Sequence, residues 1–287
     1  MARVFLRQQR HLRHASFSRS DSAMLSPTAW KVRGAPTLHL LEDAPYVDGV
    51  FVASGLTVWP AARVLAEYVL GDGAASLKGR RVLELGAGTG AVGLACAIAG
   101  AARVVLTDRL VEVKESEQLC RRQLELLERN VELNQSLCGT CQVQVAELEF
   151  SDSEASASVV RHHGPFDFVI GSDITYSILY DCCKLVKCIS SICATHADIQ
   201  ETTNPPSLGS GLRMTSASPQ VLLAHKCRTD SCMEQLLERL GQVGLGATEI
   251  HWNSGVVILK IGPCAAGFGQ DCPAQERRSF YLRHSLY

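Results

Sequence analysis

A glycine-rich turn at residues 82–90 constrains the fold of this chain more than any other feature. The segment V-L-E-L-G-A-G-T-G begins as a short apolar strand that carries one acid, Glu84, and ends in three alternating glycines. A helix is predicted directly after it, from Ala91 to Ala99. Glycine permits a sharp turn and lets a ligand approach the main chain, and the start of a helix offers unpaired N–H groups and a positive dipole end. We therefore expect a nucleotide-sized ligand at the carboxyl end of a strand in an open α/β sheet.

A second strand, 103–107, is predicted next, and it ends in Asp108. A carboxylate about twenty residues after the glycines can accept both hydroxyls of a ribose. Two cofactors fit: residues 88–93 satisfy the G-x-G-x-x-G of NAD sites, whereas the frame E-x-G-x-G-x-G from Glu84 resembles motif I of S-adenosylmethionine-dependent methyltransferases. The acid inside the first strand favours the second cofactor, because it suits a ligand with its own amino group and sulfonium charge. A glycine turn that holds no ligand is the remaining alternative.

The composition limits the class of protein. A chain of 287 residues, 46% of them apolar, can form one large domain with a sizeable core. Its formal charge of −1 gives no reason to expect a nucleic-acid partner, and no apolar run approaches the roughly 18 residues of a membrane span. The twelve cysteines are expected to be reduced, inside the cell. The C-x-x-C at Cys138 has no second pair at zinc spacing, so we expect no metal site.

The first 29 residues form a predicted basic tail. Five arginines precede the first acid, Asp21, with serines and phenylalanines between them. Such a segment is typical of a mitochondrial transit peptide and equally of a disordered basic tail, and the sequence does not decide whether residues 1–20 are cleaved. We expect a cytoplasmic protein, with a nuclear location also open and a mitochondrial one as the alternative.

Periodicity predicts alternating strands and helices after this tail, in a domain over residues 30–262 that is followed by a C-terminal tail, 263–287. A hairpin or extended segment is expected at 30–54, and a helix from Pro60, which suits a first turn. Later helices are predicted to end near Asn134 and to span 179–195 and 232–242, with strands at 142–150, 166–172 and 221–225 and a closing hairpin at 248–261. A polar loop is predicted at 151–164 and a flexible insertion at 197–219. This alternation predicts a mainly parallel sheet with helices on both faces.

Five short motifs follow one another over roughly residues 55–260. They are V-W-P-A-A at 58–62, E-L-G-A-G-T-G at 84–90, L-T-D at 106–108, N-x-x-x-N at 130–134 and D-x-x-Y at 173–176. In this order they resemble the class I methyltransferases of the lysine methyltransferase group called family 16, or methyltransferase-like 21. The glycine motif is shared by the whole superfamily, whereas D-x-x-Y with the upstream tryptophan is much more specific. The resemblance implies a Rossmann-like α/β fold with a mostly parallel seven-stranded sheet and an antiparallel terminal strand.

The resemblance also implies roles for individual residues. The implied cofactor is S-adenosyl-L-methionine, and the residues implied to hold it are Trp59, Glu84, Gly86, Ala87, Gly88, Gly90, Asp108, Phe150 and Ser172. Asp108 is implied to bind the ribose hydroxyls. Phe150 stands where the family usually has tryptophan and is implied to stack on or beside adenine, although it lacks the indole N–H. Asp173 and Tyr176 are implied to frame the methylated side chain.

The chemistry of these last two residues suits methyl transfer to a lysine. The reaction is an in-line displacement, so positioning supplies most of the catalysis. A lysine amine has an ordinary pKa of about 10.4 and loses its proton more easily when partly desolvated. Asp173 can orient the ammonium through a charge-assisted hydrogen bond and Tyr176 can accept a second N–H; alternatively, Asp173 caps the next helix and Tyr176 is a core residue.

We therefore expect a monomeric protein-lysine methyltransferase with a protein substrate, without a metal, a membrane or a nucleic-acid partner. The alternatives are methylation of arginine, histidine or a small molecule, and a cofactor-binding interaction protein without catalysis.

Overall fold

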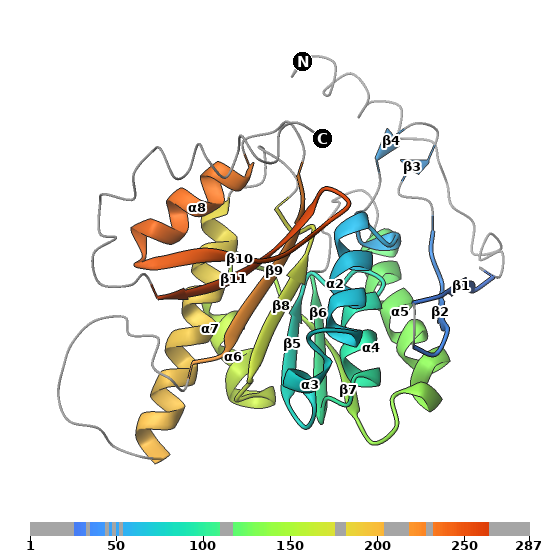
Figure 1. The fold of residues 1–287 in the computed structure, drawn as a ribbon, viewed down its shortest axis with the longest axis horizontal. Coiled ribbons are helices and arrows are strands. Elements are labelled where there is room, and N and C mark those ends of the chain that lie inside the picture. The colour runs from blue at the N-terminus through green and yellow to red at the C-terminus, as the bar shows by residue number, and fades with distance from the viewer. Residues whose placement is uncertain are drawn as a thin grey trace.

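A seven-stranded sheet forms the centre of the molecule (Figure 1). The computed structural model describes residues 26–32, 35–43, 46–47, 50–51, 54–109, 117–175, 182–203, 218–227 and 232–263. In spatial order the strands are β10 (Leu245–Asn253), β11 (Val256–Pro263), β9 (Gln220–Lys226), β8 (Phe168–Ser172), β5 (Arg81–Leu85), β6 (Arg103–Asp108) and β7 (Gln142–Glu147). The five strands from β9 to β7 are parallel, whereas β11 is antiparallel to both of its neighbours. The expected fold class is confirmed, and the terminal antiparallel strand lies inside the sheet with β10 at the edge.

Helices cover both faces of the sheet (Figure 1). On one face lie α2 (Pro60–Leu70), α4 (Ala91–Ile98) and α5 (Glu117–Asn134), and on the other α6 (Ser153–His163), α7 (Cys182–Thr203) and α8 (Cys232–Gln242). Short helical turns complete the connections: η2 (Ser54–Leu56), α3 (Ala74–Leu77) and η3 (Gln135–Leu137). Each face has its own apolar cluster, as expected for strands that are buried on both sides.

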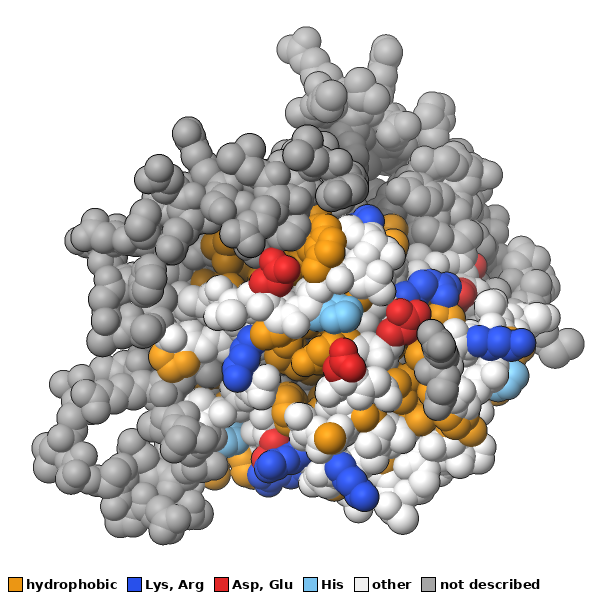
Figure 2. All heavy atoms as spheres, viewed as in Figure 1, with side chains coloured by type: hydrophobic (Ala, Val, Ile, Leu, Met, Phe, Trp, Pro, Cys, Tyr) orange, Lys and Arg blue, Asp and Glu red, His pale blue; other side chains and the backbone are white. Residues whose placement is uncertain are grey.

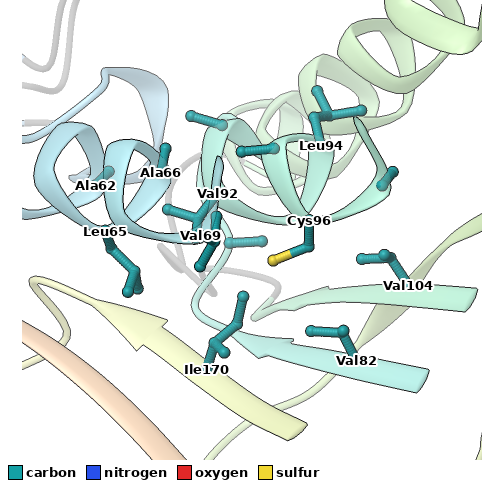
Figure 3. Packing of buried hydrophobic residues seen from close by; sticks show 14 of the residues in the cluster. Ala62, Leu65, Ala66, Val69, Val82, Val92, Leu94, Cys96, Val104 and Ile170 are labelled. Carbon is teal, nitrogen blue, oxygen red and sulfur yellow. The ribbon is translucent and has the colours of Figure 1, made fainter. Parts of the chain in front are cut away.

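The strand side chains alternate between these two clusters. Val82, Val104 and Ile170 point toward α2 and α4, where they pack with Cys96 (Figure 3). Leu83 belongs to the cluster on the opposite face. Glu84 therefore falls in the row of Val82, and its carboxyl group enters an otherwise apolar layer beneath α4.

The N-terminal part of the domain consists of two small hairpins. β1 (Thr28–Trp30) pairs with β2 (Leu38–Leu40), and β3 (Tyr46–Val47) pairs with β4 (Val50–Phe51), so the region where one hairpin or an extended segment was expected, 30–54, has two strand pairs. Residues 28 and 29, which were assigned to the basic tail, belong to β1. The arginines that defined the tail all precede residue 20, so they gave no information about where β1 begins. Trp30 is buried, and the Arg63 guanidinium carbon lies 5.6 Å from its ring centroid.

The loop predicted at 151–164 was wrong, because the structure has α6 there. The serines in this segment suggested a loop, but Asp152 caps the helix by accepting a hydrogen bond from the Ala155 N–H at 2.9 Å. An acid in the first turn and three basic residues in the last also favour a helix at this place.

The flexible insertion was predicted to begin at residue 197, and this boundary is too early. Residues 197–203 are the end of α7, and the buried side chains of Ile192 and His196 continue the helical spacing past Thr195, where the helix was predicted to stop. The remainder of the insertion up to residue 217, and the tail after Pro263, lie outside the described residues.

Candidate active site

Four adjacent parallel strands, β9, β8, β5 and β6, end at one edge of the sheet. The glycine loop, 86–90, follows β5, and Asp108 ends β6. Ser172 ends β8 opposite Ala224 of β9, and Asp173 comes directly after it. The edge therefore brings together motifs that are up to about a hundred residues apart in sequence, as expected for open α/β sheets.

The glycine loop has a backbone that few other residues adopt. Gly88 and Gly90 have φ angles of 55° and 80°, in the left-handed region. The loop is tied to the next strand because the Ala87 N–H donates to the Thr107 carbonyl at 2.9 Å. A Cβ on Gly88 would lie 3.2 Å from the Gly55 carbonyl oxygen, so the backbone of η2 approaches the loop closely.

Asp108 is 7% exposed and is held by several donors. Its Oδ2 accepts from the Gly88 N–H at 2.7 Å, and its Oδ1 accepts from the Arg109 N–H at 2.8 Å. A further hydrogen bond links it to the side chain of Gln123, on the buried face of α5. Burial raises the pKa of Asp108 above its ordinary 3.8, although these hydrogen bonds oppose the shift. The carboxylate that is predicted to bind the ribose is therefore hydrogen-bonded to the loop that is predicted to bind the cofactor.

Glu84 lies beneath the same loop with 1% exposure. Its Oε2 accepts from the Gly93 N–H at 2.8 Å, in the first turn of α4. Burial raises the pKa of Glu84 from 4.5 to about 8; the Gly93 hydrogen bond opposes this shift, and the charge of Asp108 adds to it. The carboxyl group thus contacts the backbone of α4, a contact that the sequence motif did not suggest.

Phe150 lies beside the glycine loop, after β7. A Cβ on Gly86 would lie 3.7 Å from Phe150 Cζ and 2.6 Å from Ile174 Cγ2. Phe150 is buried. An aromatic ring therefore borders the loop at the place where the resemblance implies adenine.

Asp173 links the D-x-x-Y turn to the tryptophan motif. Its φ angle is 50°, a conformation that aspartate tolerates better than most residues. Oδ2 accepts from the Ala61 N–H at 3.2 Å and Oδ1 from the Lys226 N–H at 3.1 Å. Ala61 lies in the first turn of α2, two residues after Trp59, which is half-buried and is the N-cap residue of that helix. Asp173 therefore binds the N-terminus of α2.

A buried pair fixes the same turn from the other side. Thr175 Oγ1 and His225 Nδ1 lie 2.7 Å apart, and both residues are almost fully buried. The Asp173 N–H also donates to the Ala224 carbonyl at 2.9 Å. Asp173 and Thr175 are thus bonded to three consecutive residues of β9, 224–226. The sequence interpretation missed His225, although a histidine at the end of a buried strand is a signal that it can serve the site.

The amides of α5 were only partly anticipated. Asn130 and Asn134 were noted as a motif, whereas Gln123 was missed. All three are buried and lie on the apolar stripe of the helix. Polar residues within such a stripe are the signal that can identify them, because buried amides need hydrogen-bond partners.

Three further features of the sequence interpretation are Tyr176, a metal site and a membrane span. Tyr176 lies outside the described residues. Across the described ranges, no group of three or more His, Cys, Asp or Glu side chains could hold a metal ion. Within the same part of the chain, no helix is long and apolar enough to cross a membrane.

A mostly parallel sheet with a glycine loop, a buried acid and the first residues of a D-x-x-Y motif at the ends of adjacent strands defines a Rossmann-like methyltransferase domain. A family model described as lysine methyltransferase matches residues 47–203, more than half of the chain. The chain belongs to this lysine methyltransferase family.

The curated relatives are named as protein methyltransferases, two of them acting on lysine and one on arginine. Protein N-lysine methyltransferase METTL21A of Mus musculus is 40% identical over 119 residues, covering 42% of this chain and 47% of the relative. Protein-lysine N-methyltransferase EEF2KMT of Mus musculus is 26% identical over 227 residues, 72% of this chain and 58% of the relative. Histone-arginine methyltransferase METTL23 of Xenopus laevis is 33% identical over 122 residues, 42% of this chain and 45% of the relative. The chain spans about half the length of the curated relatives it matches.

Proposed function

We propose that this protein is an S-adenosylmethionine-dependent protein-lysine N-methyltransferase. The observation that carries the proposal is that β8, β5 and β6, three neighbours in the sheet, end in the D-x-x-Y turn, the glycine loop and Asp108. A methyl acceptor held by the first would lie beside a cofactor held by the other two. The family assignment supports the same activity.

The described residues fit such a cofactor. The N-terminus of α4 supplies backbone N–H groups and a positive dipole end, Asp108 supplies a buried carboxylate, and Phe150 borders the loop with an aromatic ring. When bound, S-adenosylmethionine supplies an electrophilic methyl group on a sulfonium. Trp59, Glu84, Ala87 and Ser172 complete the proposed cofactor-binding set with the three loop glycines.

The contribution of the chain to the reaction is mainly positional. An ionised carboxylate can accept about four hydrogen bonds, so a lysine amine can join the Ala61 and Lys226 N–H groups on Asp173. Partial desolvation favours the neutral amine, whose lone pair would be available to attack the methyl carbon. Tyr176, as the second member of the motif, is proposed to accept the other N–H. Transfer of the methyl group to the lysine nitrogen would leave the bonding electron pair on the sulfur and would release one proton from the amine.

The proposed substrate is a protein. On the face seen in Figure 2, acidic and basic side chains of the described residues are interspersed and do not form a single basic patch, which favours a protein over a nucleic acid. We propose a cytoplasmic location; Cys96, Cys138, Cys141, Cys188 and Cys193 are thiols outside any disulfide bond, which is typical of a reducing compartment. The relative named as an arginine methyltransferase makes arginine the second candidate target.

The first test is calorimetric titration of the full chain with S-adenosylhomocysteine. Asp108→Ala is expected to weaken binding between tenfold and a hundredfold, because it removes both the ribose acceptor and the anchor of the Gly88 N–H. Asp167→Ala is the matched control. Asp167 also accepts from a backbone N–H, that of Arg81 at 2.8 Å, but it lies at the opposite edge of the sheet. Equal loss in both variants, or no binding to the parent, would contradict the proposed site.

A second test identifies the acceptor. The protein is incubated with radiolabelled S-adenosylmethionine and a cell extract, and the labelled proteins are hydrolysed to amino acids. Labelled methyl-lysine is the expected product, whereas labelled methyl-arginine would establish the second candidate.

The bond between Thr175 and His225 gives a further expectation. Thr175→Val keeps the shape of the side chain but removes its hydroxyl, and we expect methyl transfer to fall about tenfold because the bond that ties residue 175 to β9 is lost. Thr175→Ser keeps the hydroxyl and is expected to retain most of the rate. Binding of S-adenosylhomocysteine should change little in either variant. If both variants transfer methyl groups at the parental rate, the bond does not position the D-x-x-Y turn.

A further inference from the structure

Asn130 lies at a junction between the N-terminal segment and the glycine loop. It is fully buried on α5. Its Oδ1 accepts from the Leu41 N–H at 2.6 Å, and its Nδ2 donates to the Leu41 carbonyl at 3.1 Å and to the Thr89 carbonyl at 2.9 Å. One side chain therefore bonds both to the chain next to β2 and to the glycine loop.

Asn134, one helical turn later, makes a similar pair of bonds. Its Oδ1 accepts from the His39 N–H at 2.9 Å, and its Nδ2 donates to the His39 carbonyl at 2.7 Å. His39 and Leu41 are alternate residues, so their N–H and C=O groups point the same way. The two amides thus take the place of a neighbouring strand. Asn134 differs in one respect: its remaining bond goes to the Asn130 carbonyl within α5, not to the glycine loop.

The position of Thr89 gives the contact with Asn130 its importance. Thr89 lies between Gly88 and Gly90, both in the left-handed region. Glycine leaves this backbone with wide conformational freedom, and the bond to the Thr89 carbonyl limits that freedom. The packing of α5 is close here as well, since a Cβ on Gly90 would lie 2.6 Å from Leu127 Cδ1.

The N-terminal segment returns to the loop a second time. The Asp43 N–H donates to the Leu56 carbonyl at 2.8 Å, and Glu42 Oε1 accepts from the Val58 N–H at 2.7 Å. These bonds hold η2, whose Gly55 approaches Gly88. The part of the segment from Leu41 to Asp43 is therefore hydrogen-bonded to Asn130, which bonds to Thr89, and to η2, which approaches Gly88 closely.

We infer that Asn130 is a positioning residue for the cofactor, and that residues 41–43 of the N-terminal segment form part of the cofactor site. The inference rests on the proposed function. A purely structural alternative is that both asparagines only hold the N-terminal segment on α5. Under that alternative the two are equivalent, because each is buried and each pairs with one residue of that segment.

The test compares Asn130→Asp with Asn134→Asp. Each replacement keeps the size and the acceptor but loses the N–H donors. We expect the dissociation constant for S-adenosylhomocysteine to rise about tenfold or more in Asn130→Asp, and less than about threefold in Asn134→Asp, in calorimetric titrations of the full chain. The milder pair Asn130→Ser and Asn134→Ser serves if the buried carboxylates prevent folding, with circular dichroism as the folding check.

The outcomes separate this inference from the proposed function. If the parent fails to bind S-adenosylhomocysteine, the proposed function is overturned and this inference with it. If the parent binds and the two positions weaken binding equally, only the role of Asn130 is overturned. Loss of thermal stability without loss of affinity at position 130 would also overturn it.

Discussion

Replacing Asp173 with asparagine is expected to lower the rate of methyl transfer at least about a hundredfold. The asparagine fits the same left-handed backbone and has the same size, but it has one acceptor oxygen where Asp173 uses two, on Ala61 and Lys226. Its NH₂ group would face a backbone N–H, so one buried donor loses its partner at a cost of about 1–3 kcal/mol. The variant also lacks the charge that orients a substrate ammonium. We expect a melting temperature several degrees lower and a much larger loss of rate, measured as label transferred from S-adenosylmethionine to protein lysines.

Glu42→Gln is the control for this experiment. Glu42 accepts from the Val58 N–H at 2.7 Å, and Asp173 accepts from the Ala61 N–H. The two carboxylates therefore anchor the chain on either side of Trp59. Glutamine keeps an acceptor for Val58, and we expect the rate to fall less than about threefold. Equal loss in the two variants would mean that Asp173 acts only by holding α2, and its proposed contact with the substrate would be wrong.

Local sequence signals predict much of the sheet edge at which the candidate site lies. A run of apolar residues that stops at a glycine or an acid marks the carboxyl end of a buried strand, and this located Asp108 and Asp173 at one edge of the sheet. The start of α2 at Pro60 was also predicted correctly. The first N–H groups of a helix have no partner within it, so proline, which has no N–H, is well suited to this position.

The third glycine of the G-x-G-x-x-G match illustrates the limit of such signals. A Cβ on Gly93 would lie 2.0 Å from Leu106 Cδ2 and 2.6 Å from Glu84 Oε2. The small residue is needed so that α4 can pack on the sheet, which any βα unit of this kind requires. Spacing of this glycine therefore cannot decide between NAD and S-adenosylmethionine.

The bonds between distant segments could not be predicted from sequence. Ala61 and Asp173 are 112 residues apart, and Asn130 and Thr89 are 41 residues apart. Each pair joins a backbone group to a side chain. Every residue has the same backbone groups, so the sequence does not show which of them a side chain will bond to. The sequence does show which side chains need partners, namely buried amides and acids, but the partner itself emerges only from the fold.

Replacing Glu84 with glutamine is expected to remove a large part of the dependence of stability on pH. Burial raises the pKa of Glu84 from 4.5 to about 8, so between these values the folded protein holds a proton that the unfolded chain has lost. The free energy of unfolding therefore falls as pH rises from 4.5 to about 8. The full shift corresponds to a loss on the order of 5 kcal/mol. Glutamine stays neutral, and its oxygen can still accept from the Gly93 N–H.

Urea unfolding at constant ionic strength checks this expectation. At pH 5 the parent and Glu84→Gln should have similar stability, and at pH 8.5 the variant should be more stable by several kcal/mol. Asp108 is present in both proteins, so its own raised pKa largely cancels in the comparison. A variant that is less stable than the parent at pH 8.5 would show that Glu84 is charged in the fold.

The same variant tests why an acid stands in this strand. The sequence suggested that its charge matches the positive groups of the cofactor, whereas the structure directs the carboxyl group to the first turn of α4 and favours its neutral form. If the acid serves the packing of α4, Glu84→Gln should bind S-adenosylhomocysteine within about threefold of the parent at pH 7. Loss of binding at unchanged stability would instead establish that the cofactor draws the proton from Glu84 and depends on its charge.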